Sequence, residues 1–226
     1  MRFERALPIV ALLVCSLLGI ACASQTSAPK PSSPLKPVTL PSGTKLQVVA
    51  TTSIIADMAA NVGGDLIELR TLLPIGTDPH TFEPTPRDAT MLTNAHLILA
   101  NGAGLESFLE PLLKNANSRA ALVELSEGVV LRSSQEEHKE EKNEKHGDVD
   151  PHTWMTPQNA MIFVANIQRA LSALDPPHAA TYQANAERYT AQLKELDAWI
   201  RAQIETIPAE RRRLVTDHES LGYYAE

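Results

Sequence analysis

The sequence of 226 residues is poor in cysteine, in aromatic side chains and in positive charge, and each shortage excludes a class of protein. Its two cysteines, Cys15 and Cys22, lie near the amino terminus, so the rest of the chain has neither a disulfide framework nor a thiolate metal site. The net charge of −7 argues against nucleic acid as a partner, because phosphate binding requires a basic face. The hydrophobic content of 43% is nevertheless that of a folded protein.

An export signal is predicted at residues 1–21. A basic start precedes an apolar run that is shorter than the ~20 residues of a membrane span. Small Ala21 directly before Cys22 resembles a bacterial lipobox, in which the cysteine is lipidated and becomes the mature amino terminus; Gly19 departs from the leucine usual there. The alternative is an ordinary signal peptide cut near Ala21. Either way we expect an exported protein, lipid-anchored on the outer face of the cell membrane or periplasmic.

The serine- and proline-rich stretch at residues 22–44 has no apolar period. It predicts a semi-rigid tether that lifts a domain off the membrane.

From residue 45 to residue 175, short apolar runs alternate with helical patterns. Strands are predicted at 46–50, 66–73, 97–100 and 121–125. One helix is predicted from its cap Ser53 to Gly63-Gly64, a second opens at Thr85-Pro86 with Asp88 three residues after the cap, and a third lies around 105–113. This alternation predicts an α/β lobe: a parallel four-stranded sheet with helices on both faces. Ligands bind such sheets in the loops after the carboxyl ends of the strands.

Helical patterns dominate the second half of the chain. Thr156-Pro157 opens one helix, and residues 176–208 predict a long linking helix of roughly 45 Å, long enough to be the backbone between two lobes. Residues 213–216 predict a strand and residues from 219 onward a helix. We therefore expect residues 209–226 to be the truncated start of a second α/β lobe, in a fragment, a shortened gene or a frameshifted one.

Three of the seven histidines lie in turn-rich loops: His80 in Gly-Thr-Asp-Pro-His, His152 in Asp-Pro-His-Thr-Trp and His218 in Thr-Asp-His-Glu. Proline stiffens the first two loops and so fixes where the imidazoles point. Three neutral imidazoles with a carboxylate or water complete a tetrahedral zinc site. On spacing alone, however, three unconnected loop histidines remain the simpler interpretation. His96 and His178 are expected to be structural or solvated.

The motifs around these histidines resemble the ligand loops of the cluster A-I solute-binding proteins, the zinc and manganese receptors of ABC importers. Residues 76–86 (GTDPHTFEPTP) resemble the first ligand loop, residues 150–157 (DPHTWMTP) the second and residues 216–224 (TDHESLGYY) the third. Their order is that of the family, with the long helix between the second and third motifs. The resemblance covers residues 46–226.

The resemblance implies a metal site made by His80, His152 and His218. Manganese-type members often have glutamate at the third position, so a histidine there leans toward Zn²⁺, with Mn²⁺ as the alternative. The fourth ligand of the family is commonly a carboxylate deep in the second lobe, for which this sequence has no counterpart. Glu83, in the first loop, is a candidate to orient His80.

The segment 133–149 is rich in acidic and lysine side chains and includes His138 and His146. One interpretation is a solvated charged loop. The other, which the resemblance favours, is an auxiliary metal-collecting segment beside the site; its lysines argue against tight binding.

The expected function is therefore an extracytoplasmic receptor, not an enzyme, that captures Zn²⁺ and delivers it to an ABC permease in the cytoplasmic membrane. We expect it to act as a monomer. The alternatives are a manganese receptor or a surface adhesin of the same family, and less plausibly a zinc hydrolase, for which the sequence offers no evident general base.

Overall fold

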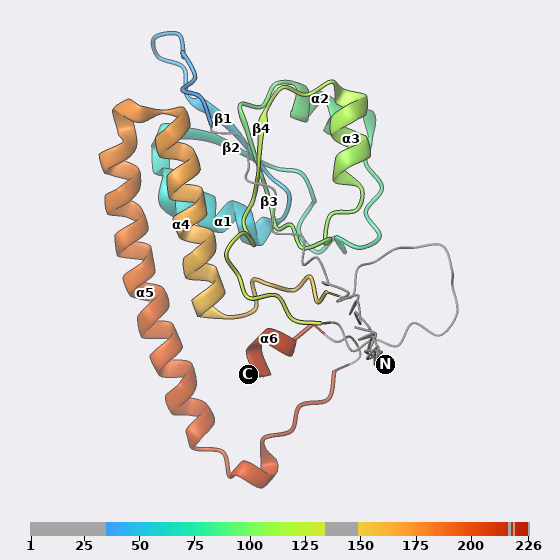
Figure 1. Ribbon diagram of the computed structural model, residues 1–226, viewed down its shortest axis with the longest axis vertical. Helices are drawn as coiled ribbons and strands as arrows, with labels where there is room; N and C mark the ends of the chain where they lie inside the picture. Colours follow the sequence, from blue (N-terminus) through green and yellow to red (C-terminus); the bar gives the residue numbers. More distant parts are fainter. Residues whose placement is uncertain (1–34, 134–148, 217, 219, 226) are drawn as a thin grey trace, which may run out of the picture. The chain divides into compact units, whose positions relative to one another are not determined.

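The computed structural model describes residues 35–133, 149–216, 218 and 220–225 (Figure 1). The predicted signal peptide at 1–21, the lipidation candidate Cys22 and the histidines His138 and His146 lie outside the described residues. Within the described part of the chain, no helix combines the length and the hydropathy needed to cross a bilayer.

The core of the lobe is a sheet of four parallel strands in the order β2-β1-β3-β4. The strands are β1 (Leu46–Ala50), β2 (Ile67–Thr71), β3 (Leu97–Ala100) and β4 (Ala121–Glu124). The central strand β1 pairs on both sides, so that Val48 lies opposite Leu69 of β2 and Leu97 of β3. The predicted fold class, a parallel α/β lobe, is confirmed.

Helices cover both faces of this sheet (Figure 1). One face packs against α1 (Ser53–Gly63), α4 (Pro157–Leu174) and α5 (Ala179–Glu205), and the other against α2 (Pro86–Thr93) and α3 (Leu109–Ala116). Alternation along the strands explains the two layers, because successive side chains point to opposite faces. In β3, Leu97 and Leu99 enter the first core, and Ile98 and Ala100 the second.

Local capping explains where several helices begin. At α2, the amide of Thr85 donates a 2.7 Å hydrogen bond to Oδ2 of Asp88, as the sequence predicted. At α4, Oγ1 of Thr156 accepts from the amide of Asn159. The predicted cap of α1 was wrong by one residue: Thr52, not Ser53, caps it by accepting from the amide of Ile55.

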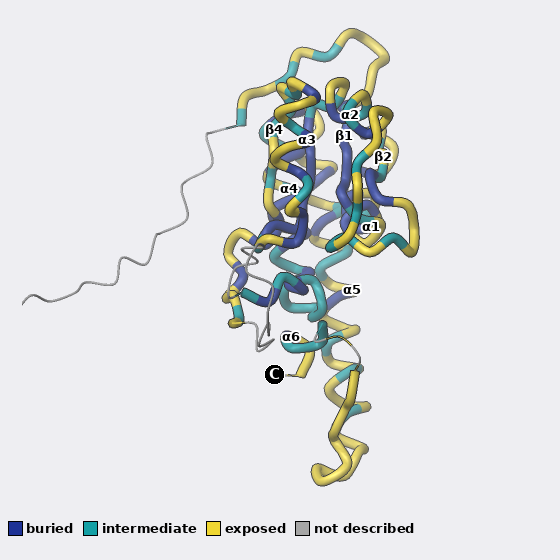
Figure 2. Tube along the Cα trace, turned by 90° about the vertical axis from the view of Figure 1, so that its right-hand side faces the viewer, coloured by how far each residue is buried: buried dark blue, intermediate teal, exposed yellow. Residues whose placement is uncertain are grey.

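The long linking helix divides at its start. Residues Pro176–His178 form a short 3-10 turn, and α5 follows it over 27 residues. Only Tyr182, Ala186 and Leu193 of α5 are buried, so its distal half is largely exposed (Figure 2).

Three elements differ from the sequence expectation. The helix predicted around 105–113 begins later, at Leu109, because the loop before it holds Gly102, Ala103 and Gly104 at positive φ. Residues 212–216 are exposed and form no strand, since no strand of the described residues lies beside them to pair with. The last helix, α6 (Gly222–Ala225), starts after the predicted position 219.

The end of the predicted tether packs on the lobe. Leu35, Val38 and Leu40 contact the larger core, and the amide of Val38 donates a 2.8 Å hydrogen bond to the carbonyl of Leu174. Three apolar side chains among the prolines therefore bind residues 35–40 to the lobe, where the composition had predicted only a spacer.

Candidate metal centre

The imidazoles of His80, His152 and His218 converge at the carboxyl-end side of the sheet. His80 lies in the loop after β2, His152 in the turn before α4, and His218 in the segment after α5. Nε2 of His152 lies 3.2 Å from Nε2 of His80 and 3.0 Å from Nε2 of His218. One ligand atom from each of the three residues lies within 4.8 Å of the other two.

This spacing suits a single divalent ion. A tetrahedral zinc ion with Zn–N bonds of ~2.0–2.1 Å separates two ligand nitrogens by about 3.4 Å. The two measured Nε2 separations, 3.2 and 3.0 Å, are slightly shorter than this value. The three ligand atoms, all within 4.8 Å of one another, are thus close enough to surround one ion. His152 is buried, His80 is partly buried and His218 is exposed, so the centre opens toward solvent on the His218 side.

Asp150 fixes the orientation of the His152 ring. Its Oδ1 atom lies 2.7 Å from Nδ1 of His152 and also accepts a 2.9 Å hydrogen bond from the His152 amide. Because a carboxylate only accepts, Nδ1 donates to Asp150, which leaves Nε2 as the ring atom that faces the other two histidines. This carboxylate–histidine arrangement is the one that orients imidazole ligands in metal sites.

A buried asparagine holds both neighbours of His152. Nδ2 of Asn101 donates a 2.9 Å hydrogen bond to the carbonyl of Pro151, and its Oδ1 accepts one of 3.0 Å from Oγ1 of Thr153. Asn101 directly follows β3, and it is 1% exposed. The sheet thus positions the His152 turn through a single side chain.

The loop around Asn101 is organised by the buried carboxylate of Glu106. Its Oε1 accepts hydrogen bonds from the Thr51 hydroxyl and from the backbone amide of Asn101, each at 2.7 Å. Its Oε2 accepts one from the backbone amide of Gly102 at 3.1 Å. Burial raises the pKa of the Glu106 carboxyl above its ordinary value, although these hydrogen bonds oppose the shift. Glu106 therefore joins the carboxyl ends of β1 and β3, next to which the His152 turn is attached.

Asp78 organises the first histidine loop. Its Oδ1 accepts a 2.9 Å hydrogen bond from the His80 amide, and its Oδ2 accepts from the Thr81 hydroxyl at 3.2 Å. The amide hydrogen bond is the main reason why the pKa of Asp78 lies below its ordinary value. Glu83, the predicted orienting residue, is exposed and is not part of the three-histidine group. In the described structure, the acid that contacts the His80 backbone is Asp78.

Trp154 forms a wall beside the centre. Its ring meets that of His152 edge to face, with centroids 5.4 Å apart, and it also packs against the larger core. The other tryptophan, Trp199, is 60% exposed on α5. A change in Trp154 fluorescence is therefore a local reporter of the centre.

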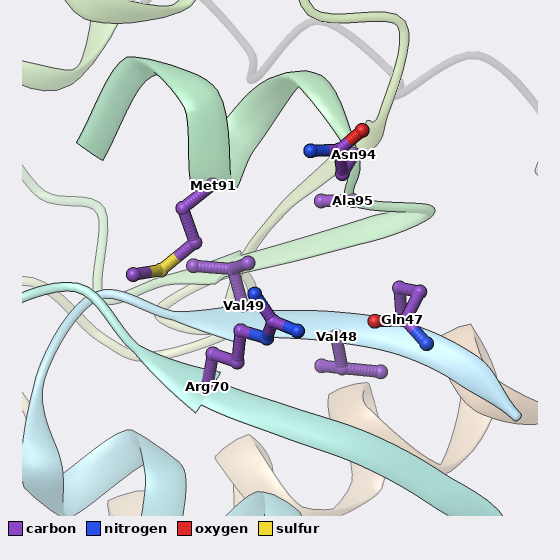
Figure 3. A pocket seen from close by; sticks show the side chains of 7 residues that line it. All are labelled: Gln47, Val48, Val49, Arg70, Met91, Asn94 and Ala95. Atoms are coloured by element: carbon purple, nitrogen blue, oxygen red, sulfur yellow. The ribbon is translucent and has the colours of Figure 1, made fainter. Parts of the chain in front are cut away.

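The other two described histidines serve the fold. Nδ1 of His96 accepts a 2.9 Å hydrogen bond from the amide of Gln47, and His178 lies 2.7 Å from the carboxylate of Asp175 at the turn before α5. A cavity of about 150 Å³ between β1 and α2 offers no comparable chemistry (Figure 3). Its one charged side chain, Arg70, is paired with Glu68.

The sequence motifs indicate the three histidines but not the residues that support them. Asp150 stands two residues before His152, as Asp78 stands before His80, and this repeated Asp-x-His spacing was a usable signal. The sequence carries no comparable signal for Asn101 and Glu106, because their role depends on contacts with residues about 50 positions away in sequence.

This lobe, with histidines gathered from three loops and a long helix between the second and the third of them, has the architecture of a metal-binding solute receptor. The family model described as ZnuA, zinc-uptake complex component A, periplasmic, matches residues 48–226, and the chain belongs to this family. It is a family of substrate-binding proteins and not of enzymes.

The relatives differ in the metal that their names give. The manganese ABC transporter substrate-binding lipoprotein PsaA of Streptococcus mitis is 40% identical over 191 residues. A Mn-bound periplasmic metal-binding protein from Candidatus Liberibacter asiaticus superposes with a TM-score of 0.71 at 32% identity over 80% of this chain. Zn(II)-bound AdcA from Streptococcus pneumoniae superposes with a TM-score of 0.68 at 26% identity over 80% of this chain.

The chain spans only part of these proteins. The match to PsaA covers 82% of this chain and 60% of the relative, and the two structures are covered to 65% and 37% of their own lengths.

Proposed function

We propose that this protein is an extracytoplasmic receptor that captures Zn²⁺ through His80, His152 and His218 and delivers it to an ABC permease. The observation that carries the proposal is the position of the three imidazoles, whose ligand nitrogens lie within 4.8 Å of one another. Membership of the family supports the transport role. The protein acts as a monomer that binds its cargo and catalyses no reaction.

Zinc is the proposed cargo because of the ligand chemistry. Imidazole is a borderline ligand that binds Zn²⁺ well, whereas Mn²⁺ prefers oxygen donors and stands at the weak end of the Irving–Williams order. Manganese is the second candidate, favoured by the manganese transporter named among the relatives and by the Mn-bound structure.

Competition titration against a chromophoric chelator separates the two metals. We expect Zn²⁺ to bind the wild-type chain with one tight site and Mn²⁺ to bind more weakly. Tighter binding of Mn²⁺ than of Zn²⁺ would reverse the assignment. If the wild-type chain binds neither metal, the receptor proposal itself is refuted.

The proposed arrangement places the receptor on a membrane. Cys22 carries the lipid, and residues 22–44 form the tether, whose residues 35–40 pack against the lobe. Residues 45–175 form the metal-binding lobe, 176–208 the link and 209–226 the first part of a second lobe. Cys22→Ala is expected to move the protein from the membrane to the soluble fraction, and equal membrane retention of the variant would contradict the lipid anchor.

A further inference from the structure

The segment that carries His218 is attached to the lobe by a buried tyrosine. Tyr223 belongs to α6, a helix of four residues, yet it is only 6% exposed and packs within the larger core. Its hydroxyl donates a 2.9 Å hydrogen bond to the carbonyl of Asp150 and accepts one of 3.1 Å from the amide of Arg132. Burial raises the pKa of Tyr223, so the hydroxyl keeps its proton for donation.

The tyrosine binds beside an isolated antiparallel pairing of residues 132–133 with residues 149–150. The amide of Asp150 donates a 2.9 Å hydrogen bond to the carbonyl of Arg132, and Ser133 pairs with Val149 in the next position. The guanidinium of Arg132 also lies over the Tyr223 ring, 5.8 Å from its centroid. The tyrosine thus contacts both of the paired segments, at Arg132 and at Asp150.

Gly222 brings the backbone of the same segment against the Asp150 side chain. A Cβ atom at position 222 would lie 2.7 Å from Oδ2 of Asp150 and 3.1 Å from Nε of Arg132. A side chain at this position must therefore displace either α6 or the carboxylate. The other oxygen of that carboxylate is the one that orients His152.

From these contacts we infer that Gly222 and Tyr223 are positioning residues for metal capture, which dock the His218 segment on the Asp150 turn. The inference rests on the proposed metal site. One residue, Asp150, then supports two ligands: its carboxylate orients His152, and its carbonyl holds the helix that follows His218. Packing of Tyr223 for stability alone is the competing explanation.

Docking matters because the described chain just before His218 is not held by secondary structure. Residues 212–216 are exposed and have no regular structure, and His218 itself is exposed. An undocked segment would have to be ordered when the metal binds, and that cost in conformational entropy would be subtracted from the affinity. Docking through Gly222 and Tyr223 orders the segment before the metal binds, so that this entropy loss is not subtracted from the affinity.

The test is a double-mutant cycle between Tyr223→Phe and His218→Ala, with Zn²⁺ affinity measured by chelator competition. Tyr223→Phe removes the hydroxyl that makes both hydrogen bonds, and we expect it to weaken binding ~10-fold, the scale of losses on removing groups that orient metal ligands. In the His218→Ala background the same change is expected to have no further effect. The matched control is Tyr224→Phe, whose side chain is 39% exposed and whose affinity is expected to equal that of wild type.

A spectroscopic readout separates positioning from stability. With Co²⁺ as probe, the visible spectrum of Tyr223→Phe is expected to shift toward that of His218→Ala, while Tyr224→Phe keeps the wild-type spectrum. Gly222→Ala, which leaves the hydroxyl in place, is expected to weaken Zn²⁺ binding as well. If Tyr223→Phe does not fold, the part of this loss that disappears in the His218→Ala background measures the docking.

If Tyr223→Phe lowers Zn²⁺ affinity equally with and without His218, or if it leaves the Co²⁺ spectrum unchanged, the docking role is overturned. These outcomes leave the metal site intact. Absence of Zn²⁺ binding in the wild type, or full affinity in His218→Ala, would instead refute the proposed three-histidine centre.

Discussion

Oδ1 of Asp150 lies 2.7 Å from Nδ1 of His152, and both side chains are buried. The carboxylate selects the ring tautomer in which Nε2 carries the lone pair, and it fixes the plane of the ring. A matching pair stands elsewhere in the fold: Oδ2 of Asp175 lies 2.7 Å from Nδ1 of His178. The two pairs have the same chemistry, but only the first adjoins the histidine cluster.

Asp150→Asn is therefore expected to lower Zn²⁺ affinity ~10–100-fold, the scale measured for groups that orient metal ligands. The amide keeps the size of the side chain but removes the charge that stabilises the Nδ1 proton. Asp175→Asn is the control, and it should leave Zn²⁺ affinity unchanged even if it lowers the melting temperature. Equal effects of the two substitutions on affinity would contradict the role of Asp150.

Asn101→Ala is expected to affect both stability and metal binding. It leaves the Pro151 carbonyl and the Thr153 hydroxyl without their buried partner, at a cost of about 1–3 kcal/mol in the free energy of unfolding. Because these residues flank His152, Zn²⁺ affinity should fall as well. Asn94→Ala, which removes only an exposed bond to the Thr90 carbonyl, is the control in urea denaturation and zinc titration. A variant of Asn101 with wild-type affinity would show that the His152 turn holds its shape without it.

Glu106→Gln is expected to change how stability depends on pH. Burial raises the pKa of Glu106 in the folded state, so between the unfolded and folded pKa values the folded chain binds more protons than the unfolded one. Stability from this group is therefore present at acidic pH, below the unfolded pKa, and is lost as the pH rises through the folded pKa. Glutamine does not titrate.

The measurement is denaturation of wild type and Glu106→Gln across this pH range. The free energy of unfolding of Glu106→Gln minus that of wild type should increase with pH. A difference that stays constant would show that the carboxyl titrates alike in both states.

Gly102→Ala is expected to destabilise the fold more than the same substitution at Gly43, a glycine with the same φ. Both Gly102 and Gly43 have φ of 79°, a region that costs an alanine roughly 1–2 kcal/mol. A Cβ at Gly102 would also lie 2.7 Å from Oγ of Ser126 and 2.8 Å from Cβ of Glu124, whereas nothing lies within 4 Å at Gly43. Urea denaturation of the two variants isolates the steric contribution to the loss of stability. Equal losses in the free energy of unfolding would refute this contribution.

Much of the lobe was predictable from local patterns. The strands at Leu46–Ala50 and Leu97–Ala100 were predicted at their observed bounds, because short β-prone runs with marked ends define them. The capping pair Thr85 and Asp88 was equally local. The motifs also identified the three loops whose histidines lie together.

The supports of the site were not predictable in the same way. Glu106 fell within a helical pattern, where a charged residue normally faces solvent. In the structure it lies after a loop with three residues at positive φ, and its carboxylate is buried and accepts the backbone amide of Asn101. The packing of Leu35 and Val38 depends on the surface around Leu174, far along the chain. Residues 213–216 have β propensity, but a strand also needs a neighbour.

Calorimetric titration of Zn²⁺ into the wild type and into a variant with His80, His152 and His218 all changed to alanine tests the central claim most directly. His96→Ala with His178→Ala is the matched control, since these histidines lie outside the cluster. We predict one tight site in the wild type and in the control, and its loss in the triple variant. A tight site that survives removal of the three histidines would contradict the account.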